Sequence, residues 1–248
     1  MTLHLIHLPL SSRAFAQWAQ GRGFGPKGTQ DDGLALHILL SALFGRAVLQ
    51  PFRLFSPKRG DASLYAYADR DAAELCDVAQ MAGTPEMLAA IDLAQLRGKP
   101  MPAPRQGQRL GFDLRFRPVR RLTEGGRVLE RDAFASEAHR DHAGNAKKMV
   151  AAGRDREAVY RDWLAERMHR AGADLESAGL VRFQRLRVLR EGRPLEGPDA
   201  TMHGTLSVTD PELFATALAK GVGRHCAYGF GMLLLRPPGA EVPEEGRC

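Results

Sequence analysis

The chain has 248 residues, 44% of them hydrophobic, and a formal net charge of +6. This composition supports a folded core and excludes global disorder, and no run of eighteen apolar residues is present that could span a membrane. The three cysteines, Cys76, Cys226 and Cys248, lack the spacing of a disulfide framework or a zinc site. The N-terminal residues do not have the pattern of a signal peptide, so we expect a soluble, cytoplasmic protein.

The first half of the chain alternates strand and helix patterns. Its expected elements are a strand at 3–8, a helix at 33–44 capped by Asp31 or Asp32, strands at 51–55 and 63–68, helical segments at 71–83 and 84–96, and a closing segment at 99–104. Three prolines and a glycine then indicate a linker near 98–108.

The second half repeats this order. Its expected elements are a strand at 109–117, a helix at 156–173, a bulged strand at 180–191, a strand at 200–210, a helix at 211–220 and a buried strand at 230–235. Both halves therefore read β-α-β-β-α-β, which predicts an α+β protein of two tandem ferredoxin-like (RRM-like) domains, at 1–104 and 105–237. The tail at 238–248 is expected to be disordered because of its Pro and Glu content.

Positive charge is concentrated in the middle of the chain. Residues 105–193 hold 21 Lys and Arg against 13 Asp and Glu, whereas residues 1–104 hold 10 against 9 and residues 194–248 hold 4 against 7. Almost all of the middle excess is arginine, whose guanidinium binds phosphate in a bidentate manner and stacks on bases. The charge therefore favours a nucleic-acid partner, with an ordinary solvated surface as the alternative.

The segment 221–231, GVGRHCAYGFG, is the most specific motif in the sequence. Its glycines and the functional side chains among them lie between a helix end and a strand: Gly221, Gly223, Arg224, His225, Tyr228, Gly229 and Gly231. Glycine lets the backbone approach phosphate closely, while arginine adds charge and tyrosine a stacking face. The spacing fits neither a Rossmann fingerprint nor a P-loop, which counts against a nucleotide cofactor. A flexible helix-to-strand turn is the structural alternative.

With VYRDWL, RLGFDLRFRPVRR and LYAYADRDAAE, this segment resembles the CasE family of type I-E CRISPR systems, from the first strand to about Pro237. The resemblance implies two ferredoxin-like domains and an endoribonuclease that cleaves pre-crRNA to mature crRNA at the base of the CRISPR repeat stem-loop. It also implies that the product stays within the Cascade complex. In that family the 2′-OH attacks the adjacent phosphate, giving 2′,3′-cyclic phosphate and 5′-OH ends with no metal or small-molecule cofactor.

The resemblance places the catalytic histidine on the first helix of the first domain, where the matching residue is His37. The helical periodicity agrees, because leucines form the apolar stripe and His37 shares another face with Gly33 and Ser41. An imidazole titrates near pH ~6.5 and can transfer protons at neutral pH, although a purely structural histidine is the alternative. Many relatives carry Tyr three residues earlier, where this chain has Leu34. We expect Arg224 or His225 to supply the second group.

RNA contacts are expected from three regions. They are the first strand of the second domain with the residues that follow it, a hairpin at 186–197, and the Gly-rich segment. By resemblance, such a hairpin enters the groove of the RNA stem. The residues are Arg115, Arg117, Arg120, Arg121, Arg187, Arg190, Arg193, Gly223, Arg224, His225 and Tyr228. A polar insertion with Lys147, Lys148, Arg154 and Arg156 is expected to order on binding, and Lys99 is a weaker candidate.

No metal site is expected. His139 and His142 have a spacing of three but no Cys or Glu-x-x-His partner, and His4, His7 and His169 suit structural or surface roles. Two other functions stay open: a non-catalytic RNA-binding protein with two RRM-like domains, and a small-molecule enzyme using the Gly-rich loop for a nucleotide phosphate.

Overall fold

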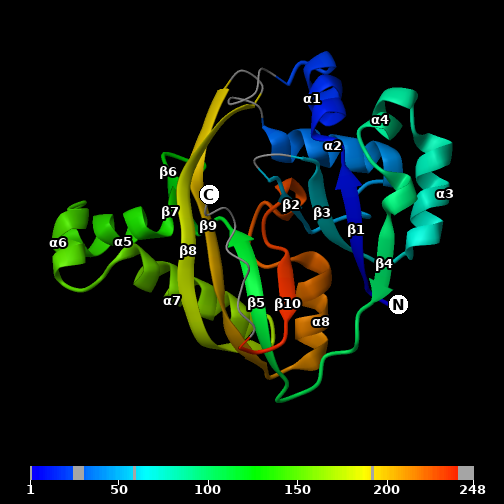
Figure 1. Ribbon diagram of the computed structural model, residues 1–248. Helices are drawn as coiled ribbons and strands as arrows, with labels where there is room; N and C mark the ends of the chain where they lie inside the picture. The colour runs from blue at the N-terminus through cyan, green and yellow to red at the C-terminus, as the bar shows by residue number, and fades with distance from the viewer. Residues whose placement is uncertain (1, 25–30, 58–59, 191–192, 240–248) are drawn as a thin grey trace.

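The computed structural model describes residues 2–24, 31–57, 60–190 and 193–239. The protein is α+β, with two four-stranded antiparallel sheets, a separate two-stranded hairpin and flanking helices (Figure 1). Among the described residues, no helix is long and apolar enough to cross a membrane. The α+β class expected from the sequence is confirmed.

The first sheet has the strand order β2-β3-β1-β4. Its strands are β1 (His4–Leu10), β2 (Phe52–Phe55), β3 (Ala62–Ala68) and β4 (Arg97–Pro100). Its helices are α1 (Ser12–Gly21), α2 (Asp32–Phe44), α3 (Ala72–Ala82) and α4 (Pro85–Ala89), followed by the 3-10 turn η1 (Leu93–Gln95). On β1, Ile6, Leu8 and Leu10 are buried in one core with the helices, as strand alternation requires.

Two expectations for the first half are wrong. Helix α1 was not predicted, although Phe15, Trp18 and Ala19 are buried at helical spacing. The helix at 84–96 is instead the short α4 and η1, because Ile91 leaves the helix to bridge to Leu10. His37 therefore lies on the second helix of this half rather than the first.

The second sheet has the strand order β10-β5-β9-β8. Its strands are β5 (Arg109–Phe116), β8 (Ala173–Arg190), β9 (Arg193–Val208) and β10 (Leu233–Arg236). Helices α7 (Arg156–Arg170) and α8 (Pro211–Lys220) and the 3-10 turn η2 (Cys226–Tyr228) belong to this half. Proline at the first position and the side chain of Asp210 start α8 as expected.

Strands β8 and β9 are longer than the sequence indicated. They pair from Ala173 with Val208 to Arg190 with Arg193, with register shifts after Leu175 and Leu180 that confirm a bulged strand. Strand β5 pairs with β9 only from Ala200 onward. Beyond that point β8 and β9 form a two-stranded ribbon that arches away from the sheet (Figure 1).

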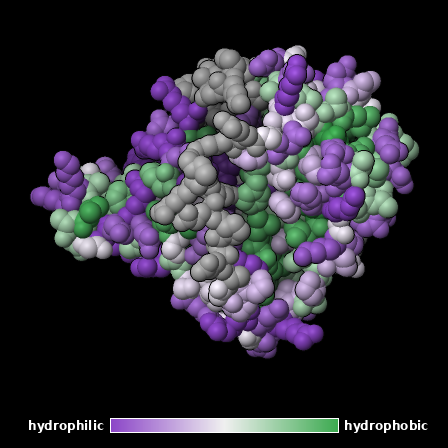
Figure 2. Space-filling view, viewed as in Figure 1, coloured by the Kyte–Doolittle hydropathy of each residue, from purple (hydrophilic) through white to green (hydrophobic). Residues whose placement is uncertain are grey.

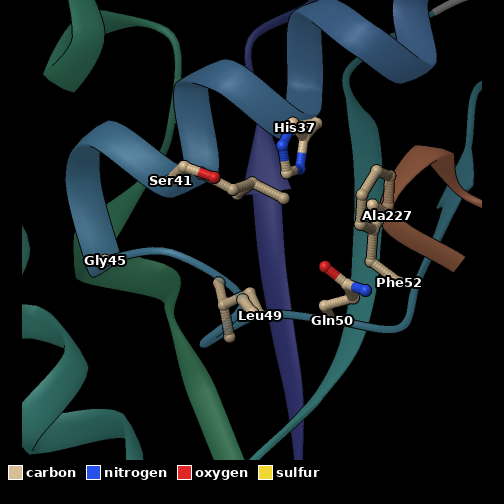
Figure 3. Close-up of a pocket in the computed structure, with 9 residues that line it drawn as sticks. His37, Ser41, Gly45, Leu49, Gln50, Phe52 and Ala227 are labelled. Atoms are coloured by element: carbon tan, nitrogen blue, oxygen red, sulfur yellow. The ribbon is translucent and has the colours of Figure 1, made fainter. Parts of the chain in front are cut away.

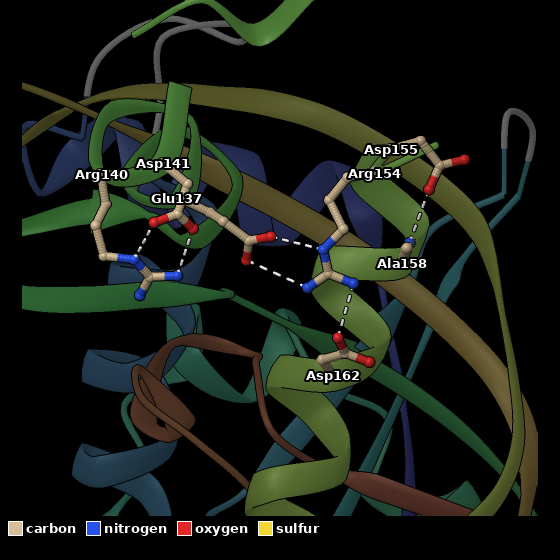
Figure 4. Close-up of polar contacts among 7 residues, drawn as sticks. All are labelled: Glu137, Arg140, Asp141, Arg154, Asp155, Ala158 and Asp162. Atoms are coloured by element: carbon tan, nitrogen blue, oxygen red, sulfur yellow. Dashed lines mark hydrogen bonds and ion pairs between the residues drawn. The ribbon is translucent and has the colours of Figure 1, made fainter. Parts of the chain in front are cut away.

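The insertion between β5 and α7 is folded, which corrects the expectation that it orders only on binding. It forms the hairpin β6 (Val119–Glu124) and β7 (Arg127–Asp132) and the helices α5 (Ala133–His142) and α6 (Ala146–Ala151). Arg154 is bound by Glu137 of α5 at 2.6 Å and by Asp162 of α7 at 2.7 Å (Figure 4). These ion pairs fix α5 against α7, while Phe134 and Met149 are buried beneath them.

The two sheets are joined by buried contacts. Tyr67 of β3 belongs to the second core, and its hydroxyl donates a hydrogen bond of 2.8 Å to the Leu233 carbonyl of β10. Asp113 of β5 lies 3.6 Å from the Arg53 guanidinium of β2 and 3.0 Å from Nε2 of His203. Burying such charges is costly unless they are paired, so this cluster favours one relative placement of the halves. On the lobe that contains α5 and α6, hydrophilic and hydrophobic side chains are mixed (Figure 2).

Candidate active site

Helix α2 presents His37 at its surface. Asp31 caps the start of the helix, and its side chain accepts a hydrogen bond of 3.0 Å from the Leu34 amide. The apolar stripe, from Leu36 to Leu43, is buried, and His37 is only half-buried. Its imidazole is therefore held by a rigid helix while keeping one side accessible, as an acid-base group needs.

The Gly-rich segment, far away in sequence, packs on this helix beside His37. The ring of Tyr228 meets that of His37 edge-on with centroids 5.4 Å apart. Gly33 makes this approach possible, because a Cβ atom there would lie 2.6 Å from the Tyr228 carbonyl oxygen. The structure thus brings together two motifs that the sequence analysis had singled out separately.

A small pocket opens beside His37 (Figure 3). Its polar lining is His37, Ser41 and Gln50, and its apolar lining includes Phe52 and Ala227. The pocket therefore combines an imidazole, a hydroxyl and an amide at the contact between α2, the start of β2 and η2. Gln50 was missed in the sequence analysis because it has no motif of its own.

Arg224 and His225 meet a carboxylate that the sequence analysis also missed. Glu130 of β7 accepts a hydrogen bond from Nε2 of His225 at 2.7 Å and pairs with the Arg224 guanidinium. The hydrogen bond from His225 and the charge of Arg224 lower the pKa of Glu130 to about 2. Glu130 is therefore ionised throughout the neutral range, and it ties the Gly-rich segment to the β6–β7 hairpin.

Several glycines of the segment are explained by packing. A Cβ at Gly231 would lie 2.6 Å from the Cys226 sulfur, and one at Gly223 would lie 3.0 Å from the Trp163 ring. Burial raises the pKa of the Cys226 thiol to about 11, so this sulfur is a packing group rather than a nucleophile. The turn is tightly packed, which argues against the flexible-turn alternative.

Two of the expected RNA-contacting arginines make contacts within the protein. Arg117, the residue after β5, is 4% exposed, so its side chain is turned into the protein. Arg115 forms two hydrogen bonds of 2.8 Å with Asp199 of β9, and its guanidinium lies over the Phe230 ring at 4.5 Å. Both arginines therefore support the base of the ribbon and the Gly-rich segment.

Other candidates lie nearer the surface. Arg120 is half-buried, Arg121 and Arg187 are exposed, and Lys99 is exposed on β4. The side chains of Arg190 and Arg193 lie outside the described part of the structure, although their backbones pair at the end of the ribbon. Arg156 is engaged by Asp132 at 2.7 Å and by the Phe183 ring.

Three of the remaining histidines lie on helices α5 and α7. His139 and His142 end α5, and His169 pairs with Asp174 on the surface at 2.9 Å. Among the residues that the structure describes, no three His, Cys, Asp or Glu side chains are grouped so as to hold a metal ion.

The sequence matches, over residues 3–237, the family described as CRISPR associated protein. The chain belongs to this family. Its membership confirms the family resemblance expected from the motifs of the second half and the Gly-rich segment. A search of the curated proteins finds no significant match.

Solved structures show the same fold over nearly the whole chain. A structure of CRISPR endoribonuclease Cse3 bound to a 19-nucleotide RNA is 24% identical, with a TM-score of 0.64, covering 96% of this chain and all of that one. The CRISPR-associated protein Cas6e from Escherichia coli K-12 is 15% identical, with a TM-score of 0.60, covering 94% and 99%. A chain of a CRISPR RNA-guided surveillance complex is also 15% identical, with a TM-score of 0.54 and the same coverage. At these identities, the comparisons establish the fold.

Proposed function

We propose that this protein is a metal-independent endoribonuclease that binds the stem-loop of CRISPR repeat RNA and cleaves pre-crRNA to mature crRNA. The observation that carries the proposal is the junction at which His37 of α2 meets Tyr228 of the Gly-rich segment. This junction lies in a fold that is also found in an RNA-bound CRISPR endoribonuclease.

The architecture behind the proposal is a pair of tandem ferredoxin-like domains. Each sheet places its strands in the spatial order fourth, first, third, second, and in each half a helix precedes the second strand and follows the third. We place the domains at 1–104 and 105–237. The short segment between β4 and β5 is consistent with a boundary there.

In the proposed reaction the RNA supplies its own nucleophile. The 2′-oxygen forms a bond to the adjacent phosphorus, the bond from phosphorus to the 5′-oxygen breaks, and His37 accepts the proton of the 2′-hydroxyl. The departing 5′-oxygen takes up a proton from solvent or from a second group at the junction, so the products are a 2′,3′-cyclic phosphate and a 5′-hydroxyl. Tyr228 offers an aromatic face beside His37, which suits stacking of a nucleobase at the cleavage site.

The RNA stem is bound by the second half in this proposal. Arg121 and Arg187 are exposed, and Arg190 and Arg193 pair across the end of the ribbon, which extends beyond the sheet. Arg224 beside Glu130 lies next to the junction, where a phosphate would compete for its guanidinium. We also propose that the processed RNA keeps the protein within a Cascade complex in the cytoplasm, supported by the likeness to a chain of a surveillance complex.

The test uses the stem-loop RNA of the CRISPR repeat from the organism that encodes the chain, incubated in EDTA. We expect full-rate cleavage, and complete block by one 2′-deoxy substitution just upstream of the scissile phosphate. Cleavage of the 2′-deoxy substrate, or a need for Mg²⁺ in the chemical step, would overturn the mechanism. Tight binding with no cleavage would instead favour the non-catalytic RNA-binding protein.

A further inference from the structure

His225 and its carboxylate lie at the same junction as His37. The His225 ring is 6.3 Å from that of Tyr228, whose other ring contact is His37 at 5.4 Å. The side chain of His225 is 15% exposed, so it is largely enclosed yet reachable from one side. Two imidazoles therefore lie beside one tyrosine ring, although they are far apart in sequence.

Glu130 determines which nitrogen of His225 can exchange a proton. The carboxylate accepts from Nε2 at 2.7 Å, so the proton on Nε2 is held and Nδ1 is left as the exchanging atom. The charged groups around this pair are Arg224, which shares Glu130, and Arg121, which lies opposite Glu130 in the β6–β7 register. The ion pair with Arg224 and the hydrogen bond from His225 keep Glu130 ionised, so that it balances the positive charge of a protonated His225.

The backbone of His225 has an unusual conformation that fixes the direction of its side chain. His225 has φ +63°, in the left-handed region that few residues other than glycine adopt. Such a conformation is costly for a residue with a side chain and persists where the surroundings hold it. Here the turn aims the imidazole at Glu130.

We propose that His225 is a second catalytic histidine, the general acid of the cleavage reaction, and that Glu130 is its positioning residue. This inference rests on the proposed endoribonuclease function. His37 takes the proton of the 2′-hydroxyl as the 2′-oxygen bonds to phosphorus. As the bond from phosphorus to the 5′-oxygen breaks, Nδ1 of His225 gives its proton to that oxygen. Leu34, at the position where many relatives carry Tyr, cannot carry a proton. In this proposal His225 of the Gly-rich segment supplies the second proton-carrying group.

A substrate whose leaving group needs no proton distinguishes a general acid at His225 from a histidine that only supports the structure. After wild-type cleavage has located the scissile phosphate, a substrate is made with sulfur in place of the bridging 5′-oxygen. Thiolate leaves without protonation, so loss of a general acid is masked on this substrate, whereas loss of the base is not. His225→Gln keeps an amide that can donate to Glu130, and His225→Asn suits the left-handed backbone. Neither exchanges a proton.

On the ordinary RNA in EDTA, at saturating protein, we expect both His225 variants to cleave about 100-fold more slowly than the wild type. On the sulfur substrate they should approach the wild-type rate, while His37→Ala stays slow. Glu130→Gln should lower the cleavage rate on ordinary RNA by a smaller factor, about 10-fold, and its rate should also be restored on the sulfur substrate. The matched control is His169→Gln, which removes an exposed histidine paired with Asp174 and should cleave normally.

The possible failures are distinct. No cleavage by the wild-type protein in EDTA would overturn the proposed function and this inference with it. Normal cleavage by His225→Gln, or an equal loss on both substrates, would overturn only the inference. The same comparison is made with Tyr228→Phe. If the sulfur substrate restores the cleavage rate of Tyr228→Phe but not that of the His225 variants, the general acid is the tyrosine instead.

Discussion

Helix α2 and the β8–β9 ribbon show how differently the two halves contribute. Helix α2 is packed in the first core along most of its length and presents one imidazole at a crowded junction. Beyond Ala200 the ribbon is no longer paired with β5, and it carries arginines on two strands that pair with each other, with β7 packed near β9. Rigid, enclosed placement suits proton transfer, whereas a projecting basic ribbon suits the groove of an RNA stem. Variants of α2 should therefore change the rate, and variants of the ribbon the affinity.

The largest expected effect is that of His37→Ala. An acid-base group acts mainly in the transition state, so the single-turnover cleavage rate should fall by about 10²–10⁴-fold while the Kd for repeat RNA changes little. Rates are measured with enzyme in excess, and Kd by filter binding with the 2′-deoxy substrate. Wild-type-like cleavage would remove His37 from the mechanism.

Gly33→Ala should break the contact between the halves without touching a proton-carrying group. The added Cβ would lie 2.6 Å from the Tyr228 carbonyl, so the Gly-rich segment must move away from His37. Misplacement of this kind costs about 100-fold in rate. Gly21→Ala is the matched control, because a Cβ there meets nothing within 4 Å and should leave cleavage unchanged. Equal activity of the two variants would mean that the observed packing is not needed for catalysis.

Replacing Arg190 and Arg193 together by Gln should act on affinity instead. Loss of two phosphate contacts should flatten the slope of log K against log salt by roughly 1.5, because fewer counterions are released. The rate at saturating protein should change little. As a control, Arg140→Gln with Arg170→Gln removes two arginines held in surface ion pairs with Asp141 and Glu166. A slope no different from that of the control would exclude the ribbon from phosphate contact.

The smallest effect concerns the pH dependence of stability. The pKa of Glu130 is about 2 in the folded protein against 4.5 for the ordinary side chain. Its stabilising contribution is therefore present above about pH 4.5 and is lost as the pH falls toward 2. Glu130→Gln should have a lower urea midpoint than the wild type at pH 7, and the gap should close between about pH 4.5 and 2. A gap that stays constant over this range would contradict the ion-paired Glu130.

Local patterns were enough to predict most of the elements. The alternation of apolar and polar residues predicted β1 and β5, and Asp210 followed by Pro211 predicted the start of α8. These signals are readable in the sequence because they act within a few residues. Helix α1 was missed although Phe15 and Trp18 carried its spacing, and the folded insertion was missed because its apolar residues are sparse. Strand β8 was predicted too short, since an edge strand with two register shifts has an interrupted alternation.

For the candidate site, the sequence by itself determined that His37 lies on the non-core face of a helix and that a Gly-rich turn with Arg224, His225 and Tyr228 precedes the last strand. Only the tertiary structure decided that these two segments meet. It also revealed Glu130, which is 95 residues from His225, and showed that Arg117 is buried. The reason is physical: burial and charge pairing depend on which distant elements pack together, and the periodicity of a single segment carries no record of its partners.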